Sequence, residues 1–389
     1  MENNKTPKIR FKGFTDPWEQ RKLGDIVPIT MGQSPDGSTY SDKPSDYILV
    51  QGNADLQNGW VTPRIWTTQI TKKADAGDLI MSVRAPAGAM GKTAYNAVIG
   101  RGVAAIKGNE FIYQLLVKMD SDGYWKTLSC GSTFESLNSN NIKNADVLIP
   151  NTDEQEKIGD YFANLDNLIT LHQRKYNKLL NVKKSMLEKM FPKNGSNIPE
   201  IRFKGFTDPW EQRKLGDCFT ERVESMPDGE LISVTINDGI KKFSELGRHN
   251  NSNDDKSKYK KVCIGDIAYN SMRMWQGASG YSPYEGIVSP AYTVLSPNSG
   301  INSKCLAYQF KLPEMIHTFQ INSQGITSDN WNLKYPALSE IEIFVSKNEK
   351  EQAKIAEYFE GLDRLITLHQ RELEKLQNIK KSMLEKMFV

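Results

Sequence analysis

The sequence predicts an α+β fold with a pseudo-twofold internal repeat: two mixed, mostly β domains joined by two long antiparallel coiled-coil helices. Three observations predict it. A 38-residue stretch occurs twice, at 154–191 and 351–388, with 27 of its 38 positions identical. A 17-residue stretch, 9–25, recurs unchanged at 201–217. The regions between these repeats are rich in Gly, Ser, Thr and β-branched residues, which is typical of strands and turns.

The short repeat belongs to an N-terminal element, residues 1–25, and to a segment of linker and second copy, residues 192–217. Within it, Asp16-Pro17-Trp18-Glu19 has the pattern of a helix start. Asp is a favoured N-cap, Pro suits the first helical position, and the Glu completes a capping box. We also expect Trp18 and its equivalent Trp210 to anchor this element against the long helices.

Residues 26–153 form the first variable domain. Short apolar runs at 47–50, 78–83 and 103–106 are separated by turn dipeptides and predict strands, and 110–119 predicts a helix. This pattern indicates a mixed, mostly β domain.

Residues 218–350 form the second variable domain, which shares little identity with the first but keeps its skeleton. Gly77-Asp78-Leu79-Ile80 followed by Arg84 corresponds to Gly265-Asp266-Ile267-Ala268 followed by Arg273. We therefore expect the two domains to share a fold and to differ in their surfaces.

The repeated stretches predict a central long helix, residues 154–191, and a C-terminal long helix, residues 351–389, because both lack Pro and good helix formers dominate. Asn151 with Glu154, and Asn348 with Glu351, have capping-box spacing. Apolar residues recur four and then three apart, the pattern of a coiled-coil seam. The expected seam positions are Ile158, Phe162, Leu165, Ile169, His172, Ile355, Phe359, Leu362, Ile366 and His369.

His172 and His369 are polar interruptions of this seam. Such residues fix register and orientation at a cost in stability. We interpret the two histidines as pairing devices, and histidines facing water at the seam edge are the equally weighted alternative. A metal site is not expected, because no other His or Cys stands at ligand spacing nearby.

Composition limits the function classes. The net charge of +3 permits nucleic-acid binding without arguing for it. No run approaches 18 apolar residues, and the first residues lack an apolar signal region, so we expect neither a membrane span nor export. The four cysteines are scattered, which predicts neither a zinc site nor a disulfide framework. A reduced, cytoplasmic protein fits best.

The common catalytic motifs are missing from the sequence. It has no glycine-rich phosphate loop, no Gly-x-Ser-x-Gly elbow and no His-Glu-x-x-His. Two of its four histidines are in the seam, which leaves little material for a His-based triad. We expect the chain to be non-catalytic by itself and to hold no cofactor or metal.

Double-stranded DNA is the candidate ligand, because polar and basic side chains gather in the expected loops. Arg reads guanine bidentately, Asn and Gln read adenine, and Lys neutralises phosphate. Solvated loop residues are the alternative for each single position. The candidates are Ser38, Tyr40, Lys43, Gln51, Asn53, Arg64, Arg84, Arg101, Ser132, Thr133, Arg248, Asn250, Lys256, Lys258, Lys260, Asn270, Arg273 and Gln276.

This layout resembles the specificity (S) subunit of bacterial type I restriction–modification systems over essentially the whole chain. The resemblance rests on two recognition domains, each followed by a long helix that begins near an Asp-Glu-Gln or Lys-Glu-Gln segment, here 153–155 and 350–352. Gly131-Ser132-Thr133 and Leu148-Ile149-Pro150 are also similar to the family. Gly325-Ile326-Thr327-Ser328 is only an approximate counterpart of the former.

The resemblance implies a bipartite DNA target, with one half read by each domain and the helix pair setting the gap. It implies two modification (methyltransferase) subunits that use S-adenosylmethionine to methylate adenine at N6. It also implies two restriction (motor-nuclease) subunits, with ATP and Mg²⁺ on the partner subunits. A protein-interaction scaffold with two peptide-binding β domains and an enzyme acting alone, either nuclease or methyltransferase, are the rival interpretations.

Overall fold

The computed structural model describes residues 5–129, 136–193, 195–236, 239–247, 249–250, 252–327 and 330–389. The chain divides into two compact units. Unit 1 comprises Met1–Lys175 and His369–Val389, and unit 2 comprises Tyr176–Leu368. Each unit therefore takes one segment from each long helix.

Unit 1 contains two mixed sheets. The first has the order β2 (Ile29–Met31), β12 (Val103–Ile106), β9 (Leu79–Ser82), β10 (Met90–Lys92), β6 (Trp60–Val61) and β5 (Leu56–Gln57). The second has the order β3 (Tyr40–Ser41), β7 (Ile65–Thr67), β4 (Tyr47–Val50), β11 (Ala97–Ile99) and β8 (Lys72–Ala74). In the central pair of the first sheet, Ala104 stands opposite Met81. All four residues of β9 are buried, and the first three, Leu79, Ile80 and Met81, are apolar.

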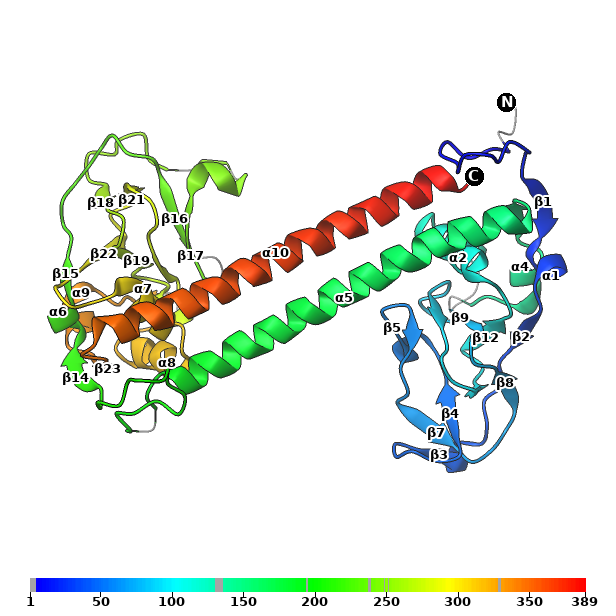
Figure 1. The fold of residues 1–389 in the computed structure, drawn as a ribbon, viewed down its shortest axis with the longest axis horizontal. Helices are drawn as coiled ribbons and strands as arrows, with labels where there is room; N and C mark the ends of the chain where they lie inside the picture. The colour runs from blue at the N-terminus through cyan, green and yellow to red at the C-terminus, as the bar shows by residue number, and fades with distance from the viewer. Residues whose placement is uncertain are drawn as a thin grey trace. The chain divides into compact units, whose positions relative to one another are not determined.

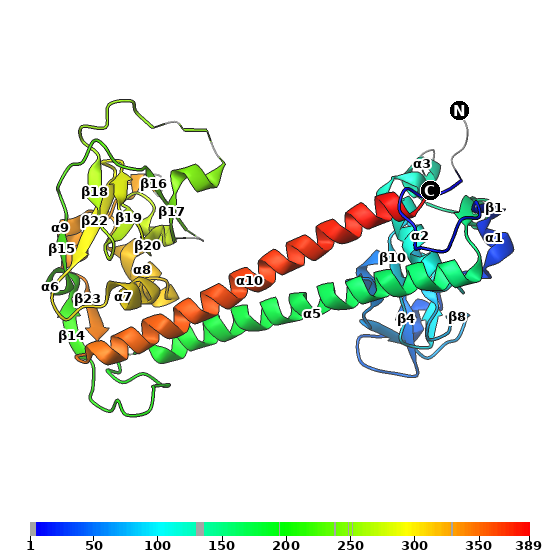
Figure 2. The ribbon, with the colours of Figure 1, turned by 45° about the horizontal axis from the view of Figure 1, so that its top comes forward.

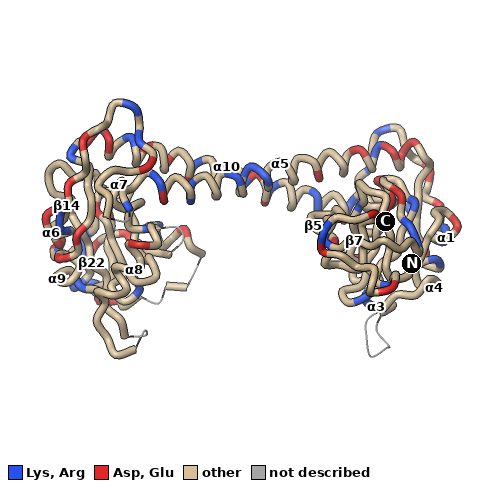
Figure 3. The backbone as a smooth tube through the Cα atoms, turned by 90° about the horizontal axis from the view of Figure 1, so that it is seen from below, with Lys and Arg blue, Asp and Glu red and all other residues tan. Residues whose placement is uncertain are grey.

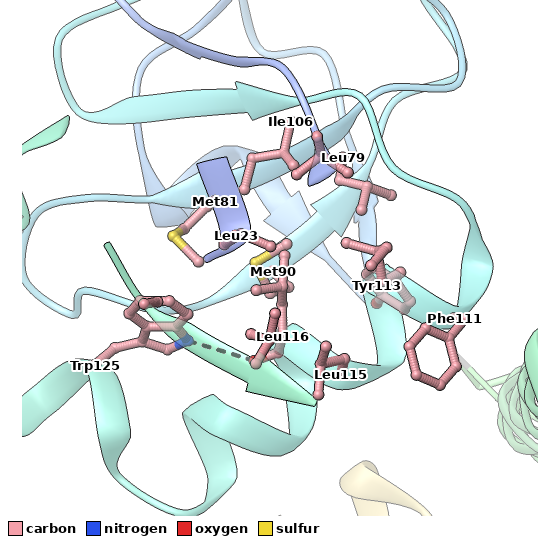
Figure 4. Packing of buried hydrophobic residues seen from close by; sticks show 14 of the residues in the cluster. Leu23, Leu79, Met81, Met90, Ile106, Phe111, Tyr113, Leu115, Leu116 and Trp125 are labelled. Atoms are coloured by element: carbon pink, nitrogen blue, oxygen red, sulfur yellow. Dashed lines mark hydrogen bonds between the residues drawn. The ribbon is translucent and has the colours of Figure 1, made fainter. Parts of the chain in front are cut away.

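Helices cover the first sheet of unit 1. They are α2 (Glu110–Ser121), α3 (Tyr124–Ser129) and α4 (Ser139–Lys143), with short 3₁₀ turns η1 (Gly37–Thr39) and η2 (Asn53–Asp55) elsewhere. Side chains of β9, β10 and β12 lie against those of α2, and the Trp125 indole N–H from α3 donates to the Leu116 carbonyl at 3.4 Å (Figure 4). α2 lies beside α5 (Thr152–Met190), where Gln114 donates to Asp166 at 2.8 Å (Figure 1).

The short repeat forms a strand, which corrects the helix start expected at Asp16-Pro17-Trp18-Glu19. β1 (Glu19–Lys22) pairs antiparallel with β13 (Asp146–Ile149), and a single helical turn, α1 (Leu23–Ile26), follows it. Trp18 is buried and packs edge-on against Phe388 at 6.1 Å between ring centroids. Pairing with a strand distant in sequence therefore outweighs the local capping pattern.

Unit 2 repeats this arrangement. Its central sheet has the order β15 (Phe219–Glu221), β22 (Tyr292–Pro297), β19 (Ile267–Asn270) and β20 (Ser279–Tyr281), which matches β2, β12, β9 and β10. Three further pairs are β14 (Glu211–Lys214) with β23 (Glu342–Val345), β16 (Ile232–Thr235) with β17 (Gly239–Lys242), and β18 (Lys260–Val262) with β21 (Gly286–Val288). The same order of the four central strands in both units confirms the duplicated α+β fold.

The remaining elements of unit 2 are α6 (Leu215–Cys218), η3 (Phe243–Leu246), η4 (Met274–Gln276), α7 (Ser303–Gln309), α8 (Pro313–Ile321) and α9 (Tyr335–Ser339). α7 lies beside the first turns of α10 (Glu349–Met387), where the Tyr308 hydroxyl donates to Asp363 at 2.8 Å (Figure 2). No helix in the described part of the chain is both long and apolar enough to cross a membrane.

Segments of α5 and α10 pack antiparallel within each unit. In unit 1, Lys380 of α10 pairs with Asp166 of α5 at 2.6 Å. In unit 2 the same pair recurs with the helices exchanged, since Lys183 of α5 pairs with Asp363 of α10 at 2.5 Å. Partner residue numbers thus fall on one helix as they rise on the other, as in an antiparallel pair.

The expected seam residues differ in burial along each helix. Ile158, Phe162 and Leu165 are buried in the core of unit 1, and Ile355, Phe359 and Leu362 are buried in the core of unit 2. Ile169, His172, Ile366 and His369 are half-buried. The first turns of each helix therefore complete the core of one variable domain, and the later of these seam positions are less buried.

Candidate nucleic-acid interface

Two arginines of the short repeat link it to the long helices. Arg10 makes a bidentate pair with Glu154 at 2.7 and 2.8 Å, and Arg202 makes the same pair with Glu351 at 2.6 and 2.9 Å. Both glutamates are buried. The Glu154 hydrogen bonds raise the pKa of Arg10, and those of Glu351 raise the pKa of Arg202. These two guanidinium groups therefore have a structural role, because each is bound to a buried carboxylate.

The glutamates also lie in the first turn of each long helix. The Asn151 side chain accepts the Glu154 backbone N–H at 2.9 Å, as the capping pattern predicts. The Glu154 carboxylate binds Arg10 instead of returning to the backbone, so the side-chain half of the capping box is replaced by an ion pair. In unit 2, Glu351 also accepts from Trp210 at 3.1 Å. The short repeat is thereby fixed to the start of each helix.

Three candidate arginines are in the opposite situation. Arg84, Arg101 and Arg273 are exposed, and none has an ion pair with a carboxylate among the described residues. An exposed guanidinium without a carboxylate partner keeps its donors for a ligand and suits bidentate recognition of a base edge or a phosphate.

The structure brings Arg84 and Arg101 to neighbouring loops of unit 1. The Val83 N–H donates to the Gly102 carbonyl at 2.9 Å, and the Arg101 N–H donates to the Ser34 hydroxyl at 3.1 Å. Gly102 also lies against the backbone of Gln51, where a Cβ would meet the Gln51 carbonyl oxygen at 2.0 Å. Arg84, Arg101 and Gln51 therefore share one edge of the domain, which we call the Arg84 edge.

Arg64 has a partner and differs from these residues. Its Nε donates to the buried Asp55 at 2.9 Å. Asp55 also accepts the backbone N–H groups of Gln51 at 2.7 Å and Gly52 at 3.2 Å, which holds the loop that carries Asn53. We assign Arg64 mainly to this loop and not to a base contact.

Ser38, Tyr40 and Lys43 lie around β3. The Ser38 hydroxyl donates to Asp36 at 2.7 Å, and this hydrogen bond lowers the pKa of Asp36. The Tyr40 hydroxyl donates to the Pro35 carbonyl at 3.3 Å. Lys43 is exposed. The Ser38 and Tyr40 hydroxyls thus already have partners within the loop, which leaves Lys43 the more accessible of the three.

The lysine run at 256–261 is divided in unit 2. Lys260 pairs with Glu221 at 3.1 Å and Lys261 with Glu224 at 3.1 Å, both from β18. Lys256 and Lys258 precede that strand and have no ion pair with a described carboxylate. Lys258 is exposed, so it is the better phosphate candidate of the run.

Asn270, Arg273 and Gln276 come together in the turn between β19 and β20. The Asn270 side chain accepts the Met272 N–H at 3.0 Å, and the Arg273 guanidinium donates to the Gln276 side-chain oxygen at 3.3 Å. Asn250 is exposed in a loop of the same unit. Ser132, Thr133 and Arg248 lie outside the described residues, as does Cys130.

Other chemistry has little support in the described residues. No group of three or more His, Cys, Asp or Glu comes together there as a metal site. Cys218, Cys263 and Cys305 are free thiols, and burial raises the pKa of Cys218 to about 11, which keeps it protonated. Basic and acidic residues are interspersed over each unit (Figure 3). Any DNA contact must therefore come from local groups such as the Arg84 edge.

A model of one protein family matches the chain twice. The family is the type I restriction modification DNA specificity domain, and the matches cover residues 15–181 and 207–378. The chain belongs to this family and carries two such domains. Each match contains one variable domain and most of the long helix that follows it, so the family unit is the same repeat that the sequence shows.

Two curated relatives come from Methanocaldococcus jannaschii. The putative type I restriction enzyme MjaX specificity subunit is 26% identical over 197 residues, covering 48% of this chain and 45% of that protein. The type I restriction enzyme MjaIX specificity subunit is 27% identical over 240 residues, covering 54% and 52%. The chain thus matches about half the length of these curated relatives.

A solved structure shares the fold. The crystal structure of the type I restriction-modification system S subunit from M. genitalium matches with a TM-score of 0.67 over 99% of both chains, at 14% sequence identity. This likeness extends over both recognition domains and both helices of the present chain.

Proposed function

We propose that this chain is the DNA-recognition subunit of a type I restriction–modification complex and that it reads a bipartite target, one half per recognition domain. One observation carries the proposal: two family domains share the order of their four central strands and have nearly identical flanking repeats, while their exposed arginine-bearing turns differ in sequence. The nearly identical short repeats and long helices hold the two domains in the same way, and the different turns read different half-sites.

The proposed partners are double-stranded DNA, two modification subunits and two restriction subunits. The long helices support two copies of one partner, because they repeat the same exposed apolar side chains. Leu168 and Leu171 of α5 are 45% and 45% exposed, and their equivalents Leu365 and Leu368 of α10 are 46% and 52% exposed. Two copies of one apolar surface would bind two copies of the same protein.

In this proposal the chain does no chemistry. The modification subunits bind S-adenosylmethionine and methylate adenine at N6, after the adenine has been flipped out of the duplex into their pocket. The restriction subunits use ATP and Mg²⁺ and cleave unmethylated DNA. The matched family is a DNA specificity domain, which agrees with a recognition role for this chain.

The test is genome-wide mapping of N6-methyladenine in cells that express this chain with and without a type I modification subunit. A two-part methylated motif that needs both proteins supports the proposal. Absence of methylation, with the two proteins shown to form a complex, contradicts it and favours the peptide-binding scaffold. DNA affinity that does not fall with added salt would favour the scaffold too, since phosphate contacts make protein–DNA binding steeply salt-dependent.

A further inference from the structure

The turn between β19 and β20, residues 271–278, occupies the same place in unit 2 as the turn between β9 and β10, residues 83–89, in unit 1. Each turn joins the third and fourth strands of sheets with the same order. Each carries one exposed arginine, Arg273 or Arg84. The two turns are therefore equivalent sites on two related domains.

Their remaining side chains differ. In unit 1 Arg84 is followed by the small residues Ala85, Pro86, Ala87 and Gly88. In unit 2 Arg273 is preceded by Met272, which is 45% exposed, and followed by Met274 and Trp275. A single exposed apolar side chain is ordinary on a protein surface. The surroundings of Met272 are what distinguish it.

The backbone around Met272 is fixed from several sides. The Met272 N–H donates to the Asn270 side chain at 3.0 Å, and the Arg273 N–H donates to the Asn270 carbonyl at 2.9 Å. Next to it, the Ser271 carbonyl accepts the Leu333 N–H at 2.9 Å. The turn is thus tied to its own strand and to a distant segment. Its tip is pre-organised, which reduces the entropy lost on binding a ligand.

Two tryptophans brace this tip. The Trp275 indole N–H donates to the Met272 carbonyl at 3.1 Å. The Trp275 ring meets the Trp331 ring edge-on, with 5.2 Å between centroids and 79° between planes. Met274, which stands between Arg273 and Trp275 in the sequence, is fully buried. These contacts hold Met272 outward, next to a guanidinium that has no carboxylate partner among the described residues.

We propose that the 271–278 turn reads the half-site of unit 2, with the Met272 side chain packed against the C5-methyl group of a thymine while Arg273 donates to the adjacent base or phosphate. This proposal rests on the proposed function. In the major groove the thymine methyl is the one apolar group that a base edge presents, and apolar side chains recognise it. Trp275 is then a positioning residue that acts through the Met272 backbone.

A thymine is present in every such half-site. If adenine is methylated in each half, a thymine stands opposite it on the other strand. The test uses the assembled complex with its modification subunits and duplexes that carry the mapped motif. Each thymine of the unit 2 half-site is replaced in turn by deoxyuridine, which removes only the methyl group.

With the parent chain, one replacement should weaken DNA binding about fourfold, because burial of one methyl-sized group contributes roughly 0.8 kcal/mol. The Met272→Ala complex should be insensitive to that replacement. Met272→Leu, which keeps an apolar side chain, should remain sensitive. Trp275→Phe, which keeps a ring but loses the N–H donor, should reduce the sensitivity. Thymines in the unit 1 half-site are the internal control.

The inference is overturned if no thymine of the unit 2 half-site responds, or if Met272→Ala responds as strongly as the parent chain. Met272 is exposed, so its variants should unfold at the same temperature as the parent, and a lowered unfolding temperature would also count against a contact role. A complex that methylates no bipartite motif at all refutes the proposed function instead, which is a separate result.

Discussion

Arg202 and Arg273 lie in the same unit and differ in what surrounds the guanidinium group. Arg202 is half-buried and gives two hydrogen bonds to the buried Glu351. Arg273 is exposed and has only the neutral Gln276 side chain within hydrogen-bond distance among the described residues. The first arrangement satisfies a buried charge, and the second leaves donors for a ligand.

Replacing Arg202 should therefore destabilise unit 2. Arg202→Ala leaves the Glu351 carboxylate buried without its cation, which costs roughly 3 kcal/mol or more. Urea or thermal unfolding measures the loss. The matched control is Lys214→Ala, since the Lys214–Glu340 pair is exposed and should contribute much less to stability. Equal effects of the two substitutions would show that the Arg202 pair has no special role.

The exposed arginines give the opposite prediction. Arg84→Ala and Arg273→Ala should leave the unfolding temperature unchanged, because neither guanidinium has an ion pair among the described residues. Each should weaken recognition of one half-site by about 5- to 150-fold, the effect of losing roughly 1–3 kcal/mol of base contact. The two variants control for each other when binding is measured on duplexes mutated in one half. Equal losses on unrelated DNA would identify phosphate contacts instead.

At the scale of elements, the apolar runs predicted the strands at 47–50 and 103–106 and the helix near 110–119, and the structure confirms all three. These three elements could be predicted because each is a local run of mostly apolar residues. Asp16-Pro17-Trp18-Glu19 failed as a helix start because β13, more than a hundred residues away, supplies the pairing partner of β1. Local sequence propensity cannot predict that pairing, because it depends on a strand distant in the sequence.

The helix pair should also weaken on acidification. His172 and His369 face each other, with 3.2 Å between their Nδ1 atoms. Burial, with the nearby His172 and Lys175, lowers the pKa of His369. The unfolded chain, with a His pKa of about 6.5, then binds the proton more readily than the folded one. The stabilisation that comes from the neutral form of His369 is therefore fully present above about pH 6.5. It is lost as the pH falls toward the lower pKa that His369 has in the folded chain.

His369→Gln should reduce this pH dependence, because it removes the titrating group and keeps a polar side chain. Thermal unfolding at about pH 5.5 and 7.5 measures the difference for each variant. His317→Gln, at an exposed position on α8, is the control and should behave as the parent chain does. If His369→Gln keeps the full acid sensitivity, another group is responsible.

The length of the helices gives a second prediction at this scale. α5 and α10 each contribute to both units, and the unit boundaries fall at 175/176 and 368/369. One extra helical turn at both boundaries adds about 5.4 Å to each helix. In the proposed function the gap of the methylated motif should widen while both halves stay the same. A gap of unchanged length would show that the helices do not set it.

For the whole molecule, the duplication could be predicted from sequence because the repeats are nearly identical. The interface could be predicted only in part. Lys258 and Lys260 look equivalent in sequence, yet Lys260 has a carboxylate partner from another strand and the exposed Lys258 has no ion pair with a described one. The sequence does not single out Met272, because methionine is usually a core residue; its exposure is seen only in the structure, where Trp275 donates to its carbonyl and packs against Trp331. Such contacts join residues that are distant in the sequence, so local sequence patterns do not predict them.

The duplication itself leads to a test of the whole molecule, in which residues 218–350 are replaced by residues 26–153 of the same chain. The frame should accept the exchange. Both insertion points follow the same 17 residues, and the core positions Ile355, Phe359 and Leu362 are the same residues as Ile158, Phe162 and Leu165. The transplanted domain would therefore pack against a face of α10 that has the same core residues as the face of α5 against which it packs in its own unit.

The expected methylated motif keeps the half read by the first domain and carries that half a second time in place of the other. Mapping N6-methyladenine with the chimera and its modification subunit measures this directly. The reciprocal exchange, with residues 218–350 in place of 26–153, is the matched control and should repeat the other half. A chimera that folds, forms the complex and still methylates the original motif would show that the variable domains do not carry the specificity.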